Sequence, residues 1–313
     1  MFVHQSALGS VIKMKVLKKI TKTIAAVIVI VIVVAVVDFA LHSVARSNAS
    51  IEFVAAKDDV ANQLIIYMPG VIAPARDSAG PLLDVWLQYG DVLLVDYSDE
   101  RFDSHIVAKQ TIKAIREKLR DYSYDSMLFI ASSMGGRLSV DVAVGLHEFN
   151  PPALYLLAVD APMSSDDLLN PFMGFAQLLR TGPIVDSLGL TYFAAAPPSL
   201  ENLEPGVDQS EVMRRVNVAR SYKLSFLEDQ AHYLGGLKAL SEGELVDVFE
   251  SIAYVRCTRA NNAIDPQAVA AWSMAFPETT VIEVDSTHVG FAEWPKTWDN
   301  TFRSLLDSIP VKQ

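Results

Sequence analysis

The sequence predicts an α/β fold with a doubly wound, mostly parallel β-sheet. Short apolar runs rich in Val, Leu and Ile recur along the body of the 313-residue chain, and segments with helical spacing separate them. Small or polar residues follow several of these runs, at the sheet edge where such folds place their sites. The composition, 51% hydrophobic and 20% charged, is that of a globular chain that can bury the core of one large domain.

An apolar helix is expected near the N-terminus. Residues 24–37 are all apolar, and the run extends to Leu41 with Asp38 as its one charge. Five lysines precede it, and by the positive-inside rule they place the N-terminus in the cytoplasm and the body across the membrane. We therefore expect a basic segment, a transmembrane or signal segment, a polar linker and the main domain, over 1–23, 24–42, 43–61 and 62–313.

Three interpretations of the apolar segment stay open. The favoured one is an uncleaved signal anchor. Cleavage after the small-x-small triplet Ser43-Val44-Ala45 would instead give a secreted protein, and a start at Met14 would give that signal a basic region of normal length. The third is a buried core helix. Asn48-Ala49-Ser50 is a glycosylation sequon, which has meaning only in a eukaryotic secretory pathway.

Strands and helices are expected to alternate through the main domain. Nearly continuous apolar runs predict strands over 63–68, 92–97, 127–130, 153–159, 252–257 and 280–284. Helical spacing or position predicts helices over 104–119, 140–146, 269–276 and 298–309. Right-handed crossovers between such units give a doubly wound sheet.

One long interval lacks any strand pattern. We interpret residues 163–248 as a mostly helical lid inserted over the strand ends, because the interval is too long for a single crossover. Its apolar residues are expected to pack the lid onto the core or to line an apolar pocket; they are Phe172, Met173, Phe175, Leu178 and Leu179.

The segment from Leu128 to Gly136 predicts a nucleophile. A strand-like run ends in a small-x-Ser-x-Gly turn, and a helix-like segment follows at once. Only small residues fit two positions before and after the serine of such a turn, and Ala131 and Gly135 stand there. The turn would expose the Ser133 hydroxyl and direct the N-terminus of the helix at the group it attacks.

A histidine base is predicted near the C-terminus. Of the six histidines, only His288 follows a terminal strand in a small polar loop, from which it can reach back to Ser133. A serine hydroxyl needs such a base to take its proton, and a carboxylate usually orients that base.

These segments together resemble the α/β-hydrolase family. The resemblance rests on the serine turn, on Pro69-Gly70 after the first inner strand and on the late His288-x-x-Phe-x-x-x-Pro segment, and it covers about residues 62–310. It implies an eight-stranded type of sheet, a lid and an acyl-enzyme mechanism. Where the family often has His-Gly, this chain has Pro69-Gly70. The resemblance implies the backbone N–H groups of Val71 and Met134 as oxyanion-hole donors.

The carboxylate partner of His288 stays open in the sequence. The position that the family uses falls on Asn261 or Asn262, and asparagine cannot compensate the charge of an imidazolium. Asp265, a few residues later, is the preferred candidate, Asp160 at the end of an earlier strand is the second, and the absence of a carboxylate is the third.

The function indicated is that of a serine hydrolase that cleaves a carboxylic ester, small or lipid-like, without cofactor or metal. The alternatives are a non-catalytic binding or envelope protein, or an acyltransferase or thioesterase that uses the same residues. The net charge is −11, and the first 46 residues contribute +5, which leaves −16 for the remainder. So acidic a body argues against nucleic acid as a partner.

Overall fold

The computed structural model describes residues 4–44, 48–56, 62–71, 74–97, 101–169, 203–220, 223–259 and 263–308. Asn261, Asn262 and the apolar residues between Phe172 and Leu179 lie outside these ranges.

Seven strands form one sheet in the described part of the chain, in the order β1-β3-β2-β4-β5-β6-β7. The strands β2 to β7 are parallel to their neighbours, and only the edge strand β1 is antiparallel. The predicted α/β fold is confirmed, although the described sheet has seven strands and not eight. The strands are β1 (Ala49–Val54), β2 (Gln63–Met68), β3 (Asp91–Tyr97), β4 (Ser126–Ser132), β5 (Ala153–Val159), β6 (Ser251–Cys257) and β7 (Thr280–Val284).

Helices cover both faces of the sheet. Side chains of the inner strands alternate between two apolar clusters: Ile66 and Met68 join one, and Ile65 and Tyr67 join the other. The first cluster contains the helices α4 (Ser104–Asp121), α5 (Met134–His147), α9 (Leu224–Gly235) and α10 (Ala268–Ala275). The second contains α2 (Ala75–Ala79), η1 (Gly80–Leu82), α3 (Leu83–Trp86) and α11 (Pro295–Ser308).

The segment that was expected to be a linker contains a strand. Within 43–61, residues 49–54 form β1, so the linker prediction is corrected there. The strand is short and half-exposed, and Ile51 and Phe53 pack against the core on one face while Ser50 and Glu52 are exposed or partly exposed. An edge strand with one solvated face has only this weak alternation to reveal it.

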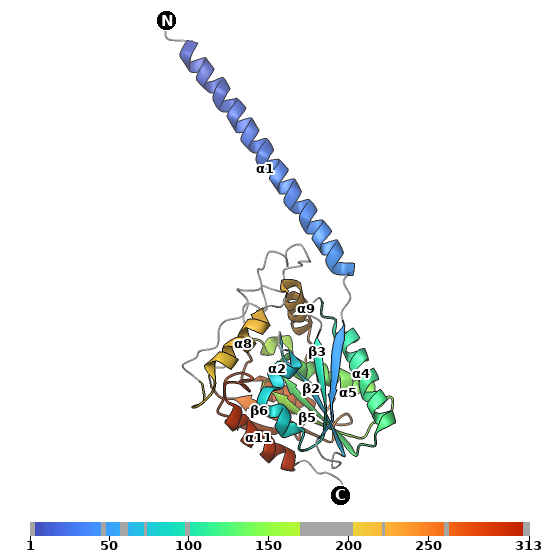
Figure 1. The fold of residues 1–313 in the computed structure, drawn as a ribbon. Coiled ribbons are helices and arrows are strands. Elements are labelled where there is room, and N and C mark those ends of the chain that lie inside the picture. Colours follow the sequence, from blue (N-terminus) through green and yellow to red (C-terminus); the bar gives the residue numbers. More distant parts are fainter. Residues whose placement is uncertain are drawn as a thin grey trace.

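The first helix, α1 (His4–Val44), projects away from the domain (Figure 1). Its residues Ile20–Leu41 have a mean hydropathy of 3.2 and are long enough to cross a membrane, as a signal sequence near an N-terminus would also be. The large apolar side chains of this stretch are exposed, which contradicts the interpretation as a buried core helix.

The described part of the interval between β5 and β6 consists of helices joined by turns and irregular segments. It contains η2 (Ser165–Asp167), α8 (Gln209–Arg220) and α9, and no strand among its described residues. A lid over 163–248 remains a prediction, because 170–202 lie outside the described residues.

Candidate active site

Ser133 occupies a strained turn between β4 and α5. Its backbone angles are φ 49° and ψ −124°, and its side chain is partly exposed between the buried residues Ser132 and Met134. A Cβ added to Gly135 would lie 2.1 Å from the carbonyl oxygen of Met68, and one on Gly136 would lie 2.2 Å from Cβ of Ala161. Because helix and strand ends approach so closely, only glycine fits at these two positions.

Asp160 follows β5 in the place that corresponds to Ser133 on the neighbouring strand. Its φ is also positive, at 43°, and its side chain is only 1% exposed. The backbone N–H donates to the carbonyl oxygen of Val255 at 2.8 Å, and Oδ1 accepts the N–H of Cys257 at 3.0 Å. Both bonds tie Asp160 to β6 and direct its second carboxylate oxygen toward the end of the sheet.

That second oxygen meets His288. Nδ1 of His288 lies 3.2 Å from Oδ2 of Asp160, and the imidazole is 26% exposed. A tight turn after β7 holds the histidine, in which the N–H of Gly290 donates to the carbonyl oxygen of Thr287 at 3.0 Å. A buried carboxylate thus contacts a partly exposed imidazole, and in the tautomer that donates Nδ1–H to Asp160 the other ring nitrogen, Nε2, carries no proton.

Asp265, the preferred candidate for the acid, has another role. Its backbone N–H donates to the carbonyl oxygen of Asp167 at 2.7 Å, and its Oδ1 accepts the N–H of Gln267 at 2.8 Å. The carboxylate therefore shapes the turn that leads into α10. Asp265 and Asp160 line one cavity of about 180 Å³, but the structure pairs His288 with Asp160, the second candidate, and we therefore propose Asp160 as the acid.

The proposed oxyanion-hole donors sit beside the serine turn. Met134 is the first residue of α5, and Val71 follows Gly70, whose added Cβ would lie 3.0 Å from Cβ and 3.6 Å from Oγ of Ser133. The hydroxyl of Tyr97 donates to the carbonyl oxygen of Pro69 at 2.9 Å and fixes this loop. The loop after β2 and the N-terminus of α5 therefore face the same hydroxyl.

A buried tyrosine lies behind the turn. The Tyr67 hydroxyl is hydrogen-bonded to Ser78 and, at 3.4 Å, to Ser132. Burial raises the pKa of Tyr67 to about 12, so the phenol stays neutral at pH 7 and supports the turn as an uncharged hydrogen-bonding group.

Backbone strain is concentrated at this edge of the sheet. Four non-glycine residues in the described part of the chain have a positive φ, and three of them are Ser133, Asp160 and Val289, the residue after His288. Val289 is β-branched, for which φ 49° is a marked outlier. Such conformations cost about 1–3 kcal/mol each and cluster at functional sites. The sequence predicts strain only at Ser133, from the tight turn between strand and helix, and gives no such signal for Asp160 or Val289.

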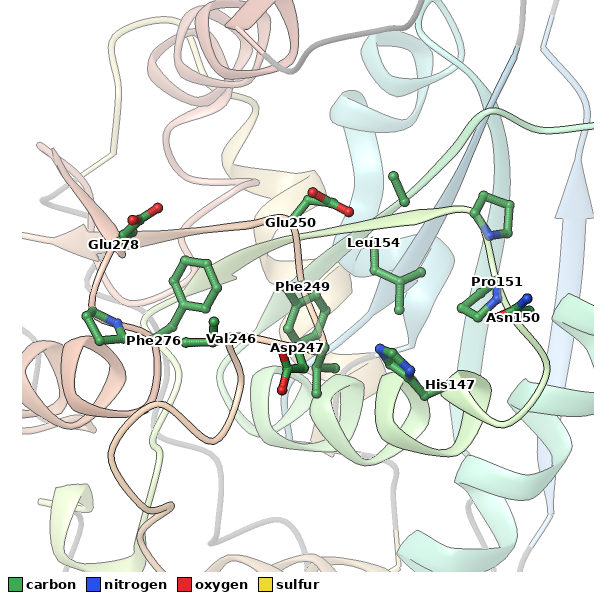
Figure 2. A pocket seen from close by; sticks show the side chains of 14 residues that line it. His147, Asn150, Pro151, Leu154, Val246, Asp247, Phe249, Glu250, Phe276 and Glu278 are labelled. Atoms are coloured by element: carbon green, nitrogen blue, oxygen red, sulfur yellow. The ribbon is translucent and has the colours of Figure 1, made fainter.

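A larger cavity lies at the opposite edge of the sheet. It measures about 630 Å³ and is lined by the segments that lead into β5, β6 and β7. Figure 2 shows Asp247, Glu250 and Glu278 around it, with His147 at one side. Because it lies at the amino ends of parallel strands, this cavity is remote from Ser133 and His288. Among the described residues, no group of three His, Cys, Asp or Glu side chains is placed to hold a metal ion.

Solved structures with the same architecture are esterases and related hydrolases. An esterase from Rhodococcus sp. ECU1013 aligns with a TM-score of 0.59 at 13% identity, covering 84% of this chain and 96% of its own. An enol-lactonase from Burkholderia xenovorans LB400 aligns with a TM-score of 0.61 at 11% identity, covering 84% and 97%. A thermophilic esterase from Thermogutta terrifontis aligns with a TM-score of 0.57 at 9% identity, covering 84% and 94%. No protein-family model and no curated protein matches the chain. The chain has the α/β-hydrolase fold.

Proposed function

We propose that this α/β-hydrolase-fold chain is a membrane-anchored serine hydrolase that cleaves a carboxylic ester. One observation carries the proposal: Ser133, Asp160 and the His288 turn share one sheet edge, each in or beside a strained backbone, with His288 bonded to a buried carboxylate. The esterases and hydrolases that share the fold support the reaction class.

The mechanism follows from these positions. Nε2 of His288 takes the proton of Ser133 as Oγ attacks the ester carbonyl, and the backbone N–H groups of Val71 and Met134 stabilise the oxyanion. The imidazolium returns the proton to the leaving alkoxide, which leaves an acyl group on Ser133. His288 then activates a water molecule, whose attack releases the acid and restores the serine. Asp160 stabilises the imidazolium in both steps.

The alternative of a non-catalytic binding protein was motivated by Asn261 and Asn262, which stand where the family has its acid. In a non-catalytic protein of this kind, His288 would have no carboxylate partner. The 3.2 Å contact between His288 and Asp160 therefore supports the catalytic proposal over this alternative.

Labelling of the full chain in detergent with a fluorophosphonate probe tests the nucleophile. Wild type should label, Ser133→Ala should not, and His288→Ala should label far more slowly. Product analysis with a short soluble ester, in water with and without an added alcohol, separates hydrolysis from acyl transfer. A folded wild type that neither labels nor cleaves any ester would refute the proposal.

A further inference from the structure

The membrane helix joins the domain at the active-site edge of the sheet. The edge strand β1 runs antiparallel to β3, and its first residue, Ala49, pairs with Tyr97, the last residue of β3. The chain thus enters the sheet where the parallel strands end. Ser133 and Asp160 directly follow two of those strands, and His288 follows a third. In Figure 1, α1 meets the domain on the side of α9, away from the C-terminus.

The register of the strands sets Ala49 level with the nucleophile. Tyr67 pairs with Leu94, and Met68 pairs with Ala131. Continued past the strand ends, these pairings place Gly70 opposite both Tyr97 and Ser133. Only β3 and β2 stand between β1 and β4, so at about 4.8 Å per strand the entry point lies roughly 14 Å from the nucleophile strand.

The junction between helix and domain is short. Helix α1 ends at Val44 and β1 begins at Ala49, so five Cα-to-Cα steps join them, at most about 17 Å when fully extended. A glutamine of α4 fixes the domain side of the junction: Oε1 of Gln110 accepts the N–H of Ala49 at 2.6 Å, and its Nε2 donates to Asn48 at 2.8 Å. The domain therefore has little freedom to turn another edge toward the bilayer.

A cavity of about 350 Å³ lies between α8, the residue Pro81 of η1 and the segment that follows His288. Apolar side chains from all three walls line it, namely Pro81, Val207, Val212, Ala292 and Pro295, and Asp208, Glu211 and Arg215 add charged groups on one wall.

We infer that the active-site edge faces the membrane and that the substrate is a neutral amphiphilic ester drawn from the bilayer. This inference rests on the proposed function, in both the hydrolase and the anchor. An acyl chain can remain in lipid while its ester group reaches Ser133. The charge of −16 on the body disfavours an anionic headgroup, so an uncharged acylglycerol fits better than an acidic phospholipid.

Two cysteines at opposite ends of one helix test the orientation without any need for activity. His105 and Ser123 are exposed and lie at the start of α4 and just after its end, about 27 Å apart. Each is changed to cysteine in the full chain, labelled with a fluorescent maleimide and reconstituted in phosphatidylcholine vesicles that carry a headgroup quencher. Cys257 is kept, because it is buried and burial raises the pKa of its thiol, so it stays unreactive.

The dye at position 105 should be quenched several-fold more than the dye at position 123. Equal quenching, stronger quenching at 123, or no quenching at either position in vesicles that carry the protein would overturn the orientation. None of these results depends on whether the chain is a hydrolase.

A longer junction tests the substrate class. About thirty Gly and Ser residues are inserted between Arg46 and Ser47 of the full chain, which leaves the site unchanged but frees the domain from the surface. Hydrolysis of soluble p-nitrophenyl acetate should be unchanged, and hydrolysis of 1-monooleoylglycerol in the same vesicles should fall several-fold. The substrate proposal would be overturned if the lengthened variant hydrolysed the vesicle ester as fast as wild type. It would also be overturned if wild type cleaved the soluble ester but not the vesicle ester. If wild type cleaved neither ester, the proposed hydrolase function would be refuted instead.

Discussion

At the scale of single residues, the positive φ angles of Ser133, Asp160 and Val289 stand out because the three residues follow, or lie just beyond, the carboxyl ends of neighbouring strands. Aspartate, like asparagine at the fourth such residue, Asn150, tolerates the left-handed region, but valine does not. Ser133 and Asp160 belong to the proposed catalytic set, and Val289 turns the chain directly after His288. The surrounding fold must therefore supply the free energy that holds this edge in shape.

The identity of the acid can be tested by two matched substitutions. Asp160→Asn should lower kcat on a soluble ester by roughly 10³- to 10⁴-fold, because an amide neither fixes the tautomer of His288 nor stabilises its positive charge. Asp265→Asn keeps an oxygen that can accept the N–H of Gln267, so its kcat should stay within a few-fold of wild type. Steady-state kinetics on both variants decides, and the reverse pattern would restore Asp265 as the acid.

The partly buried carboxyl of Glu293 should make stability depend on pH. Burial raises its pKa above the ordinary 4.5, against the opposing effects of its own backbone N–H and of the charge of Arg215. Its contribution is therefore most favourable below the unfolded pKa and is lost as pH rises through the folded pKa. Glu293→Gln should then be more stable than wild type at pH 7 and no more stable at pH 4.

Urea unfolding of the full chain in mild detergent, followed by tryptophan fluorescence at both pH values, measures this difference. The exposed Glu148→Gln serves as the control for loss of one negative charge. A Glu293→Gln variant with the same advantage at pH 4 as at pH 7 would show that ionisation is not the cause.

At the scale of elements, the contact between the end of β2 and the start of α5 decides whether the site forms. A Cβ on Gly135 would meet two backbone oxygens, those of Met68 at 2.1 Å and Pro69 at 2.6 Å. Gly135→Ala should therefore move the strand end or the helix, cost about 1–3 kcal/mol or more and abolish probe labelling at Ser133.

Gly145 of the same helix provides the comparison. An added Cβ there would meet Cδ1 of Ile112 at 2.5 Å, which is the far end of a flexible side chain. Alanine also favours the helical backbone by about 1 kcal/mol, so Gly145→Ala should melt near the wild-type temperature and label normally. If both variants behaved alike, the close approach at Gly135 would not be what shapes the turn.

The elements that the sequence predicted well are those with a single strong signal. The inner strands β2 and β5 are continuous apolar runs buried on both faces and have the predicted bounds, as does the mostly exposed edge strand β7. Helix α5 begins at Met134, before the helix-like segment predicted from Arg137 and the apolar pattern predicted from Val140, because Gly135 and Gly136 hide its first turn. Strand β1 was not predicted because it is short and because the polar residues of its exposed face resemble those of a linker.

The residues of the candidate site also differ in how strong a local signal each has in the sequence. Ser133 is predictable because the turn, its small neighbours and the flanking elements are consecutive in sequence. The proposed acid is not predictable, because Asp160 and His288 are 128 positions apart and meet only through the register of three neighbouring strands. Sequence position favoured Asp265, but the turn before α10 uses that carboxylate for its own backbone.

At the scale of the whole molecule, the first helix should remain part of the mature protein. An epitope tag placed before Met1 should stay attached and should sediment with membranes after an alkaline carbonate wash, because Ile20–Leu41 can span the hydrocarbon core. Loss of the tag, with a mature chain that begins at Arg46, would show instead that the segment is a cleaved signal.

The short junction between α1 and β1 also changes how the reaction rate should scale. An enzyme held against a bilayer searches for substrate by lateral diffusion, so its velocity follows the mole fraction of ester in the surface and not the amount of ester per litre. Adding inert lipid at constant total ester would then slow turnover by surface dilution alone. The local environment of the anchor, through the packing and fluidity of the lipid around it, thereby becomes a determinant of catalytic output.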